Sequence, residues 1–302
     1  MNSIHPSQIL SVFLVAACLL GMAAPASAAP KKLLVVTVTK GFRHTSIETA
    51  EKVLGELAQK SGAFTVDYAR VSPSDPQFKG PDGKPDTNKI NAAIEKVLAE
   101  KMSLASLANY DGVIFANTTG DLPLPDKQGF LDWIKSGKAF IGMHSATDTF
   151  RGHTPLDLYV EMMGAEFKHH GPKQPEVDCI NQDPKHPATQ PVPETWHLKD
   201  EIYEFNGFDR SKVHGLLTLD KNPENGTPGD YPISWCKMYG QGRVFYTSLG
   251  HREDVWDPNT PPNFKRENSK EISEKYQEHI LGGIKWALGL AKGDAKPQTA
   301  KP

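Results

Sequence analysis

His144 lies where an apolar run gives way to small and polar residues, in the segment IGMHSATDTF of residues 141–150. The pattern resembles the strand-to-helix elbow on which α/β enzymes display a nucleophile between two small residues. Here Gly142 and Ala146 are the small residues, and histidine replaces the serine or cysteine of the raised position. An imidazole there could act as a general base or as a metal ligand. Ser145 could instead be a nucleophile with His144 as its base, but adjacent side chains usually point apart, which disfavours a serine hydrolase.

Polar residues of catalytic or ligating type also follow three other predicted strands. His44 follows the first strand, Asn117, Thr118 and Asp121 follow the third, and His251 follows the late strand RVFYTSLG. The carboxyl ends of parallel strands form the ligand-binding edge of an open α/β sheet. We therefore expect these side chains to gather around the elbow histidine.

Further candidates lie outside these strand ends. Asp148 follows the elbow, where it could orient an imidazole or only cap the next helix. His170, in EFKHHGP, is expected in a loop that could fold over the sheet edge. Glu201, in HLKDEIYEF, is either an orienting carboxylate or a solvated charge. The remaining histidines considered are expected to be structural or exposed: His186, His197, His214 and His279.

Two chemistries suit this set of residues. Neutral imidazoles beside a carboxylate are good ligands for Zn²⁺ or another first-row divalent metal. The compact spacing H-x-E-x-x-H is absent, so metal-free acid–base catalysis by histidine stays open. A phosphate-binding loop is not indicated, because TKGFRHTS has a single glycine. The candidate metal ligands are His44, His144, His170 and His251, and the aromatic residues that could stack on a sugar ring or lie in the core are Phe42, Phe150, Tyr203 and Trp256.

The elements that must position these residues follow an α/β pattern. Lys32 to Thr39 is a continuous apolar run typical of a buried parallel strand, and Thr45 or Ser46 can cap the helix that follows. Ala63 to Val71 predicts a second strand, which completes a βαβ unit and implies a parallel sheet. The other predicted elements are strands at 110–116, 138–143, 176–181, 213–219, 233–238 and 243–249, and helices at 89–100, 126–136 and 272–290. We expect a flavodoxin-like open, mostly parallel sheet with helices on both faces.

Composition and the chain ends limit the classes of function. The 302 residues carry a formal net charge of −2 with scattered lysines and arginines, which argues against a nucleic-acid partner. Ile9 to Leu20 is apolar but too short to span a bilayer, and an A-x-A cleavage pattern follows it. Residues 1–28 therefore predict a signal peptide and an exported, periplasmic or secreted protein with no membrane span in the mature chain. The alternative is a lipoprotein anchored through Cys18.

The remaining cysteines and the C-terminal tail give weaker indications. Cys179 and Cys236 could pair or remain separate thiols, because sequence separation cannot establish disulfide geometry. The polar residues 292–302 are expected to be disordered.

Several short segments occur in a recognisable order along the chain. They are GFRH at 41–44, YDGVIFANTTGD at 110–121, GMHSATDT at 142–149, MGAEFKHH at 163–170, DEIYEF at 200–205, PISWC at 232–236, GRVFYTSLGH at 242–251 and HILGGIKWALG at 279–289. In this order they resemble the trehalose-utilisation, ThuA-like family, whose fold is that of class I glutamine amidotransferases. The resemblance predicts one such domain over residues 31–291.

The resemblance implies a sugar-related activity. In amidotransferases the elbow presents a catalytic cysteine, whereas His144 stands at the matching position here, so glutaminase chemistry should be absent. Family members are associated with disaccharide utilisation, often beside oxidoreductases that make 3-keto-sugars, which implies a sugar or keto-sugar as substrate. The expected reaction is glycosidic cleavage or isomerisation by histidine-based or metal-assisted chemistry. The expected catalytic residues are His144, His44, Asp148 and Glu201, and the expected contacts to sugar hydroxyls are Asn117, Thr118, Asp121 and Ser145.

Two other classes of function remain as alternatives to this enzyme. The first is a non-catalytic carbohydrate-binding protein, which would have little need for so many histidines at one edge. The second is a metal-dependent hydrolase of another small substrate.

Overall fold

The computed structural model of the chain describes residue 1 and residues 29–298. The predicted signal peptide and the alternative lipid anchor at Cys18 therefore lie outside the described residues. Within the described part, no helix is both long enough and apolar enough to cross a bilayer.

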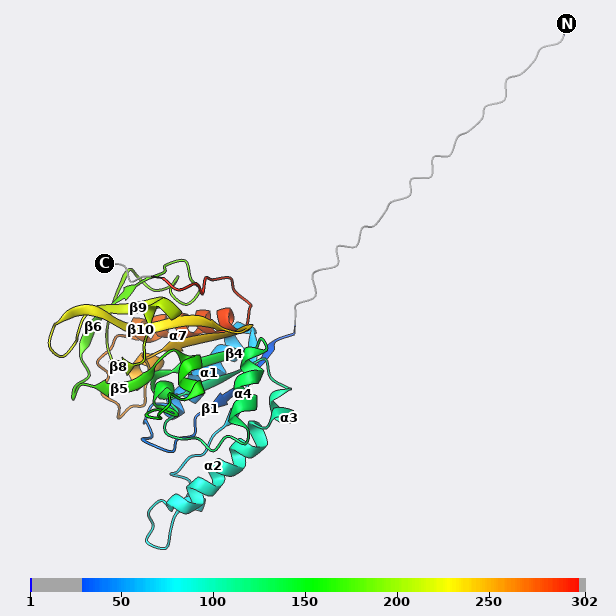
Figure 1. Cartoon of the computed structure of the whole chain (residues 1–302), viewed down its shortest axis with the longest axis vertical. Helices are drawn as coiled ribbons and strands as arrows, with labels where there is room; N and C mark the ends of the chain where they lie inside the picture. The colour runs from blue at the N-terminus through cyan, green and yellow to red at the C-terminus, as the bar shows by residue number, and fades with distance from the viewer. Residues whose placement is uncertain (2–28, 299–302) are drawn as a thin grey trace.

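A nine-stranded mixed sheet organises the molecule, in the order β2-β1-β3-β4-β11-β10-β9-β6-β7 (Figure 1). The first five strands in this order are mutually parallel, and the other four extend the sheet in antiparallel fashion. The parallel strands are β1 (Lys31–Val36), β2 (Phe64–Ala69), β3 (Gly112–Ala116), β4 (Ala139–Met143) and β11 (Gly242–Thr247). The antiparallel strands are β6 (Glu176–Asn181), β7 (Thr195–Lys199), β9 (His214–Lys221) and β10 (Pro228–Tyr239).

Helices cover both faces of the parallel part and divide its core in two. One face packs on α1 (Ile47–Ser61) and α7 (Lys270–Ala287), whose apolar side chains meet Leu33, Val35 and Ile141. The other face packs on α2 (Thr87–Lys101), α4 (Lys127–Lys135) and α5 (Leu158–Met163). Short helices complete the structure: Pro76–Phe78, α3 (Leu104–Leu107), His144–Asp148, Arg210–Lys212 and α6 (Glu253–Trp256). The predicted open α/β architecture is confirmed, with a parallel core and an antiparallel extension.

A separate two-stranded sheet lies beside the large one, where no strand pair was predicted. It consists of β5 (Glu166–His170) and β8 (Tyr203–Asn206), paired antiparallel. The expectation that His170 lies in a loop is therefore wrong, because its backbone pairs with that of Tyr203. This small sheet brings both residues to the edge where the parallel strands end.

The polar tail packs against the antiparallel strands over its described part. The ring Nδ1–H of His214 donates to the carbonyl of Lys296 at 2.7 Å, and Gln298 donates to the carbonyl of Gly215 at 2.6 Å. These hydrogen bonds correct the expectation of disorder for residues 292–298. The correction has a simple cause: the tail is held by polar groups of β9, which its own composition does not reveal.

Cys179 and Cys236 are both buried free thiols. They lie on β6 and β10, and β9 separates these two strands in the sheet. Neighbouring strands are about 4.8 Å apart, so two strands with a third between them are too far apart for the Cα separation of a disulfide.

Candidate active site

The elbow after β4 has the strained backbone that its sequence predicts. His144 adopts φ 47°, in the left-handed region that is uncommon for residues other than glycine. A Cβ atom at Gly142, two residues before the histidine, would lie 2.7 Å from the terminal methyl of Met163 and 3.1 Å from the ring of Tyr246, so a small residue suits this tightly packed position. The hydroxyl of Tyr246 donates to the backbone carbonyl of His144 at 2.7 Å and holds the turn.

The side chain of His144 is fully buried and its two ring nitrogens have distinct partners. Nδ1 lies 2.8 Å from the carbonyl oxygen of Ser248, which can only accept, so Nδ1 carries the hydrogen. Nε2 therefore carries a lone pair and no hydrogen when the ring is neutral. It lies 3.2 Å from Nε2 of His44, 3.1 Å from the hydroxyl of Tyr203 and 3.6 Å from Oε2 of Glu201.

The carboxylate of Glu201 lies among three histidines. Besides its approach to His144, its Oε1 is 3.4 Å from Nδ1 of His170 and 3.7 Å from Nε2 of His251. Burial raises the pKa of Glu201, and the charge of His170 opposes that rise. The alternative of a solvated charge is therefore wrong for this residue, because it lies inside the cluster and is largely withdrawn from water.

Desolvation keeps His44, His144 and His251 neutral. Burial first, and then the neighbouring imidazoles, lower the pKa of His44 to about 3. Burial, His170 and Arg252 lower the pKa of His251 to about 4, and burial holds the pKa of His144 well below its usual value. At neutral pH these rings present lone pairs and N–H groups rather than positive charge.

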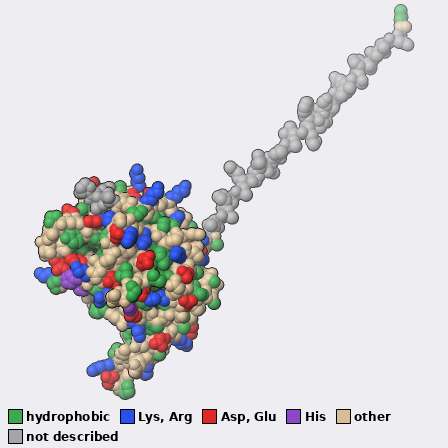
Figure 2. Space-filling view, in the orientation of Figure 1, with side chains coloured by type: hydrophobic (Ala, Val, Ile, Leu, Met, Phe, Trp, Pro, Cys, Tyr) green, Lys and Arg blue, Asp and Glu red, His purple; other side chains and the backbone are tan. Residues whose placement is uncertain are grey.

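The histidines of the cluster differ in their exposure to solvent. His44 and His144 are buried, whereas the side chain of His251 is 22% exposed and that of His170 is 41% exposed. Histidine and acidic side chains gather on the surface over β5 and β8 (Figure 2). A ligand would therefore approach His144 past the small sheet.

The structure brings Ser145 to the cluster but separates four other predicted site residues from it. Ser145 Oγ lies 3.3 Å from Nδ1 of His44. Asn117 and Thr118 are fully buried; Asn117 donates to Ser46 and to the carbonyl of Gly250, and Thr118 exchanges a hydrogen bond with Thr149. They support the loops and present no surface to a sugar hydroxyl, which corrects that expectation.

The predicted acidic residues Asp121 and Asp148 also have other partners. Asp121 is exposed and lies 2.9 Å from Nε2 of His153. Asp148 forms an ion pair with Arg151. Burial raises the pKa of Asp148 and the arginine opposes the rise. Glu201 is therefore the carboxylate that contacts the histidines. Asp148 was predicted to orient an imidazole, but no hydrogen bond joins it to a histidine of the cluster in the described residues.

Two residues of the site were not identified for the role they have. Tyr203 was considered only as an aromatic surface, yet its buried hydroxyl contacts His144, and burial raises its pKa so that it keeps its proton. No motif points to Gln174, whose side chain lies 3.0 Å from Nδ1 of His251. The signal for Tyr203 is the alternation of aromatic and polar residues in YEFN at 203–206, which is typical of a strand with one buried face.

An open α/β sheet with a histidine–carboxylate cluster at the carboxyl ends of its parallel strands defines the class of this protein. Within that class, the sequence matches the family described as ThuA, trehalose utilisation, over residues 32–287. The chain therefore belongs to the ThuA family, as its motifs indicate.

Solved structures share the fold. A putative ThuA-like protein from Parabacteroides merdae superimposes with a TM-score of 0.61 at 19% identity, over 90% of this chain and 96% of that one. A putative ThuA-like protein from Bacteroides uniformis gives a TM-score of 0.55 at 18% identity, over 88% of this chain and 95% of that one. No curated protein matches the sequence.

The neutral histidines make the free energy of unfolding depend on pH. An unfolded histidine titrates near ~6.5, so below that pH the unfolded chain binds protons that folded His44 and His251 do not. Stability of the metal-free protein should therefore fall as pH is lowered from about 7 to about 4, by up to about 1.4 kcal/mol per pH unit for each such histidine. Urea unfolding across this range measures the slope. His44→Gln should reduce this slope by the contribution of about one histidine, whereas the exposed His197→Gln should not. An unchanged slope in His44→Gln would contradict the assignment of a lowered pKa to His44.

Proposed function

We propose that this ThuA-family protein acts on a sugar or keto-sugar by removing a proton beside a carbonyl group. The observation that carries the proposal is the unprotonated Nε2 of His144, which is fixed by the Ser248 carbonyl and lies beside Glu201 and Tyr203. The family's association with trehalose utilisation supports a disaccharide-type substrate. A base, a carboxylate and a hydroxyl donor around one point are the parts that enolisation requires.

The proposed reaction begins at the C–H bond adjacent to the ketone. Nε2 of His144 takes the proton, and the electron pair of the C–H bond moves onto the carbonyl oxygen to form an enolate. Return of that pair expels the glycosidic oxygen, which takes the proton from the His144 imidazolium and leaves as the alcohol of the second sugar. Water then adds to the unsaturated ketone, so the net reaction is hydrolysis; reprotonation of the enolate instead gives isomerisation.

The neighbours of His144 support each stage. Glu201, at 3.6 Å, stabilises the imidazolium that forms when Nε2 takes the proton. Tyr203 keeps its proton, and its hydroxyl lies 3.1 Å from Nε2 of His144 in the resting site. When substrate takes that place at Nε2, the hydroxyl can donate instead to an oxygen that gains charge. This route does not require the two carboxylates that most glycosidases place on either side of the bond they cleave.

The proposal extends to the surroundings of the protein. We propose export through residues 1–28, and an oxidoreductase of the same route that supplies the ketone. The rival proposal is a non-catalytic carbohydrate-binding protein, which would bind sugar without forming product.

Replacing the proposed base tests the function directly. His144→Gln should lower kcat/KM on a 3-keto-glycoside by about 10²–10⁴-fold, the usual contribution of a positioned general base. Steady-state kinetics give the change, and circular dichroism with urea unfolding checks that the variant folds. His197→Gln, at an exposed histidine on β7 outside the cluster, is the matched control with less than a tenfold expected effect. Unchanged turnover in His144→Gln, or sugar binding without product in the wild type, would contradict the proposal.

Phe42 is proposed as the surface on which the sugar ring stacks. It is 68% exposed, its ring lies 4.9 Å from that of His44, and it is the only aromatic among the strongly exposed large apolar side chains of the described residues. Its loop is fixed because Thr119 donates to the Phe42 carbonyl at 2.8 Å. The other three aromatic candidates are buried: Phe150, Tyr203 and Trp256.

Phe42→Ala should raise KM for the keto-glycoside about tenfold with kcat nearly unchanged, because stacking stabilises bound substrate and transition state alike. Phe42→Trp should keep KM near the wild-type value. Leu104→Ala, at an exposed position on α3, is the control. Equal KM in Phe42→Ala and the wild type would exclude the stacking role.

A second candidate function is metal-assisted chemistry of the same substrate class. One ligand atom each from His44, Glu201 and His251 lie within 4.8 Å of one another, and Nε2 of His144 is 3.2 Å from Nε2 of His44. Neutral imidazoles and a carboxylate are the donors that Zn²⁺ prefers, and such a metal would polarise a carbonyl oxygen.

Plasma mass spectrometry of the purified protein tests the metal. The metal-assisted route predicts near-stoichiometric Zn²⁺ in the wild type and loss of most of it in His44→Ala, because His44 belongs both to a set with Glu201 and His251 and to a set with Glu201 and His144. His197→Ala should retain the metal. Equal metal content in wild type and His44→Ala would rule out this site.

A further inference from the structure

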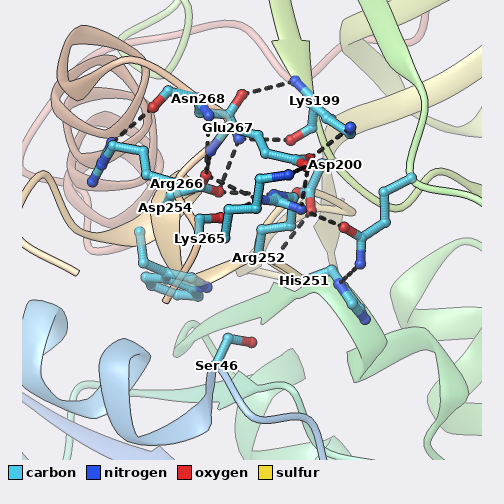
Figure 3. Close-up of polar contacts among 12 residues, drawn as sticks. Ser46, Lys199, Asp200, His251, Arg252, Asp254, Lys265, Arg266, Glu267 and Asn268 are labelled. Atoms are coloured by element: carbon cyan, nitrogen blue, oxygen red, sulfur yellow. Dashed lines mark hydrogen bonds and ion pairs between the residues drawn. The ribbon is translucent and has the colours of Figure 1, made fainter. Parts of the chain in front are cut away.

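A line of hydrogen bonds leads from a buried carboxylate to His251 (Figure 3). Asp254 is fully buried and holds the guanidinium of Arg252 by two contacts, 2.8 Å to Nε and 3.0 Å to Nη2. Nη1 of Arg252 then donates to Oε1 of Gln174 at 2.6 Å, and Nε2 of Gln174 lies 3.0 Å from Nδ1 of His251.

The arginine decides the direction of every hydrogen bond in this line. A guanidinium can only donate, so the oxygen of the Gln174 amide must face Arg252 and its NH₂ group must face His251. The NH₂ group donates, so Nδ1 of His251 accepts. In a neutral ring with Nδ1 unprotonated, the hydrogen is on Nε2.

His144 has the opposite tautomer for an equally clear reason. Its Nδ1–H donates to the Ser248 carbonyl, which leaves Nε2 without hydrogen. The Nε2 atoms of both rings approach the Glu201 carboxylate, at 3.6 Å from His144 and 3.7 Å from His251. His144 therefore presents a lone pair to the site, and His251 presents an N–H group.

We propose that Asp254, Arg252 and Gln174 fix His251 as the Nε2–H tautomer, so that it donates a hydrogen bond to the substrate oxygen that gains charge while His144 accepts the proton. Arg252 and Gln174 are positioning residues, because they act through the His251 ring. The role toward substrate rests on the proposed function, whereas the tautomer does not. A neutral imidazole that donates to a developing enolate is an established catalytic arrangement in triosephosphate isomerase, another protein.

The assignment also limits the metal alternative. A ring nitrogen that carries hydrogen has no lone pair for a metal, and Nδ1 of His251 is occupied by Gln174. His44, His144 and Glu201 are then the ligands of choice, and His251 stays outside the set.

Long-range ¹H–¹⁵N correlation spectra of the metal-free full chain, labelled at histidine, report the tautomer directly. We expect His251 to show a protonated Nε2 and an unprotonated Nδ1, and His144 to show the reverse; His251→Gln and His144→Gln assign the signals. The opposite pattern for His251 in the wild type would overturn the proposal. Added Zn²⁺ should leave the His251 pattern unchanged, and its conversion to a metal-bound Nε2 would equally overturn it.

Changing Gln174 tests the cause. Gln174→Glu replaces the NH₂ donor with a carboxylate that accepts from both Arg252 and His251, so His251 should convert to the Nδ1–H tautomer. Gln174→Leu, which offers neither donor nor acceptor, should give a mixture of both tautomers. Persistence of the wild-type tautomer in both variants would contradict the role of the relay.

The same variants separate this inference from the proposed function. Gln174→Glu should lower kcat on a 3-keto-glycoside about 10²-fold with little change in KM, because the donor acts mainly on developing charge. A tautomer change with kcat unchanged would overturn the role of His251 toward substrate. Absence of wild-type turnover would refute the proposed function while the spectra still decide the tautomer.

Discussion

The site depends on the backbone hydrogen bonds that the carboxylate of Asp200 accepts. This carboxylate is fully buried and accepts backbone N–H groups of Glu201, Gly250 and Arg252 at 3.0, 2.7 and 3.1 Å. These contacts tie the segment before β8 to the loop after β11, near the line of hydrogen bonds that reaches His251 (Figure 3). Burial raises the pKa of Asp200 to about 7, and the three N–H groups oppose that rise because they favour the charged form.

Gly250 extends this connection to the other side of the sheet edge. Its carbonyl accepts from Ser46, from Asn117 and from the indole of Trp256. Its own φ of 116° is unfavourable for a side chain, and a Cβ there would lie 2.7 Å from the hydroxyl of Tyr276. The strand ends that carry the histidines are thus joined through one loop, which explains why loops from distant parts of the sequence converge around Glu201.

Burial of these strand ends sets the chemistry. Withdrawal from water lowers the pKa of His44, His144 and His251, so these rings are neutral. Their hydrogen-bond partners then decide whether each ring nitrogen presents a lone pair or an N–H group. Two neutral rings with opposite tautomers face one carboxylate, and only the rim formed by His170 and His251 reaches solvent. A site of this kind can accept a proton at one point, beside a carboxylate that stabilises the resulting imidazolium, and donate a hydrogen bond at another.

The sequence predicts the parts of this arrangement that rest on local pattern. The apolar runs of β1, β3 and β4 mark the parallel core, and the small residues around His144 mark the elbow. The strand EFKHH has no alternation of apolar and polar residues, so nothing local distinguishes β5 from a loop. The burial of Asn117 and the hydroxyl contact of Tyr203 depend on tertiary packing, and no spacing along the chain reveals them.

Solvent deuterium exchange is the most direct measurement of the central claim that His144 removes a proton beside a carbonyl. A 3-keto-glycoside incubated with the protein in deuterium oxide and followed by proton NMR should lose the signal of the hydrogen next to the ketone, or yield product labelled there. His144→Gln should show only the slow uncatalysed exchange. Turnover without deuterium at that carbon, or equal exchange in His144→Gln, would contradict the account.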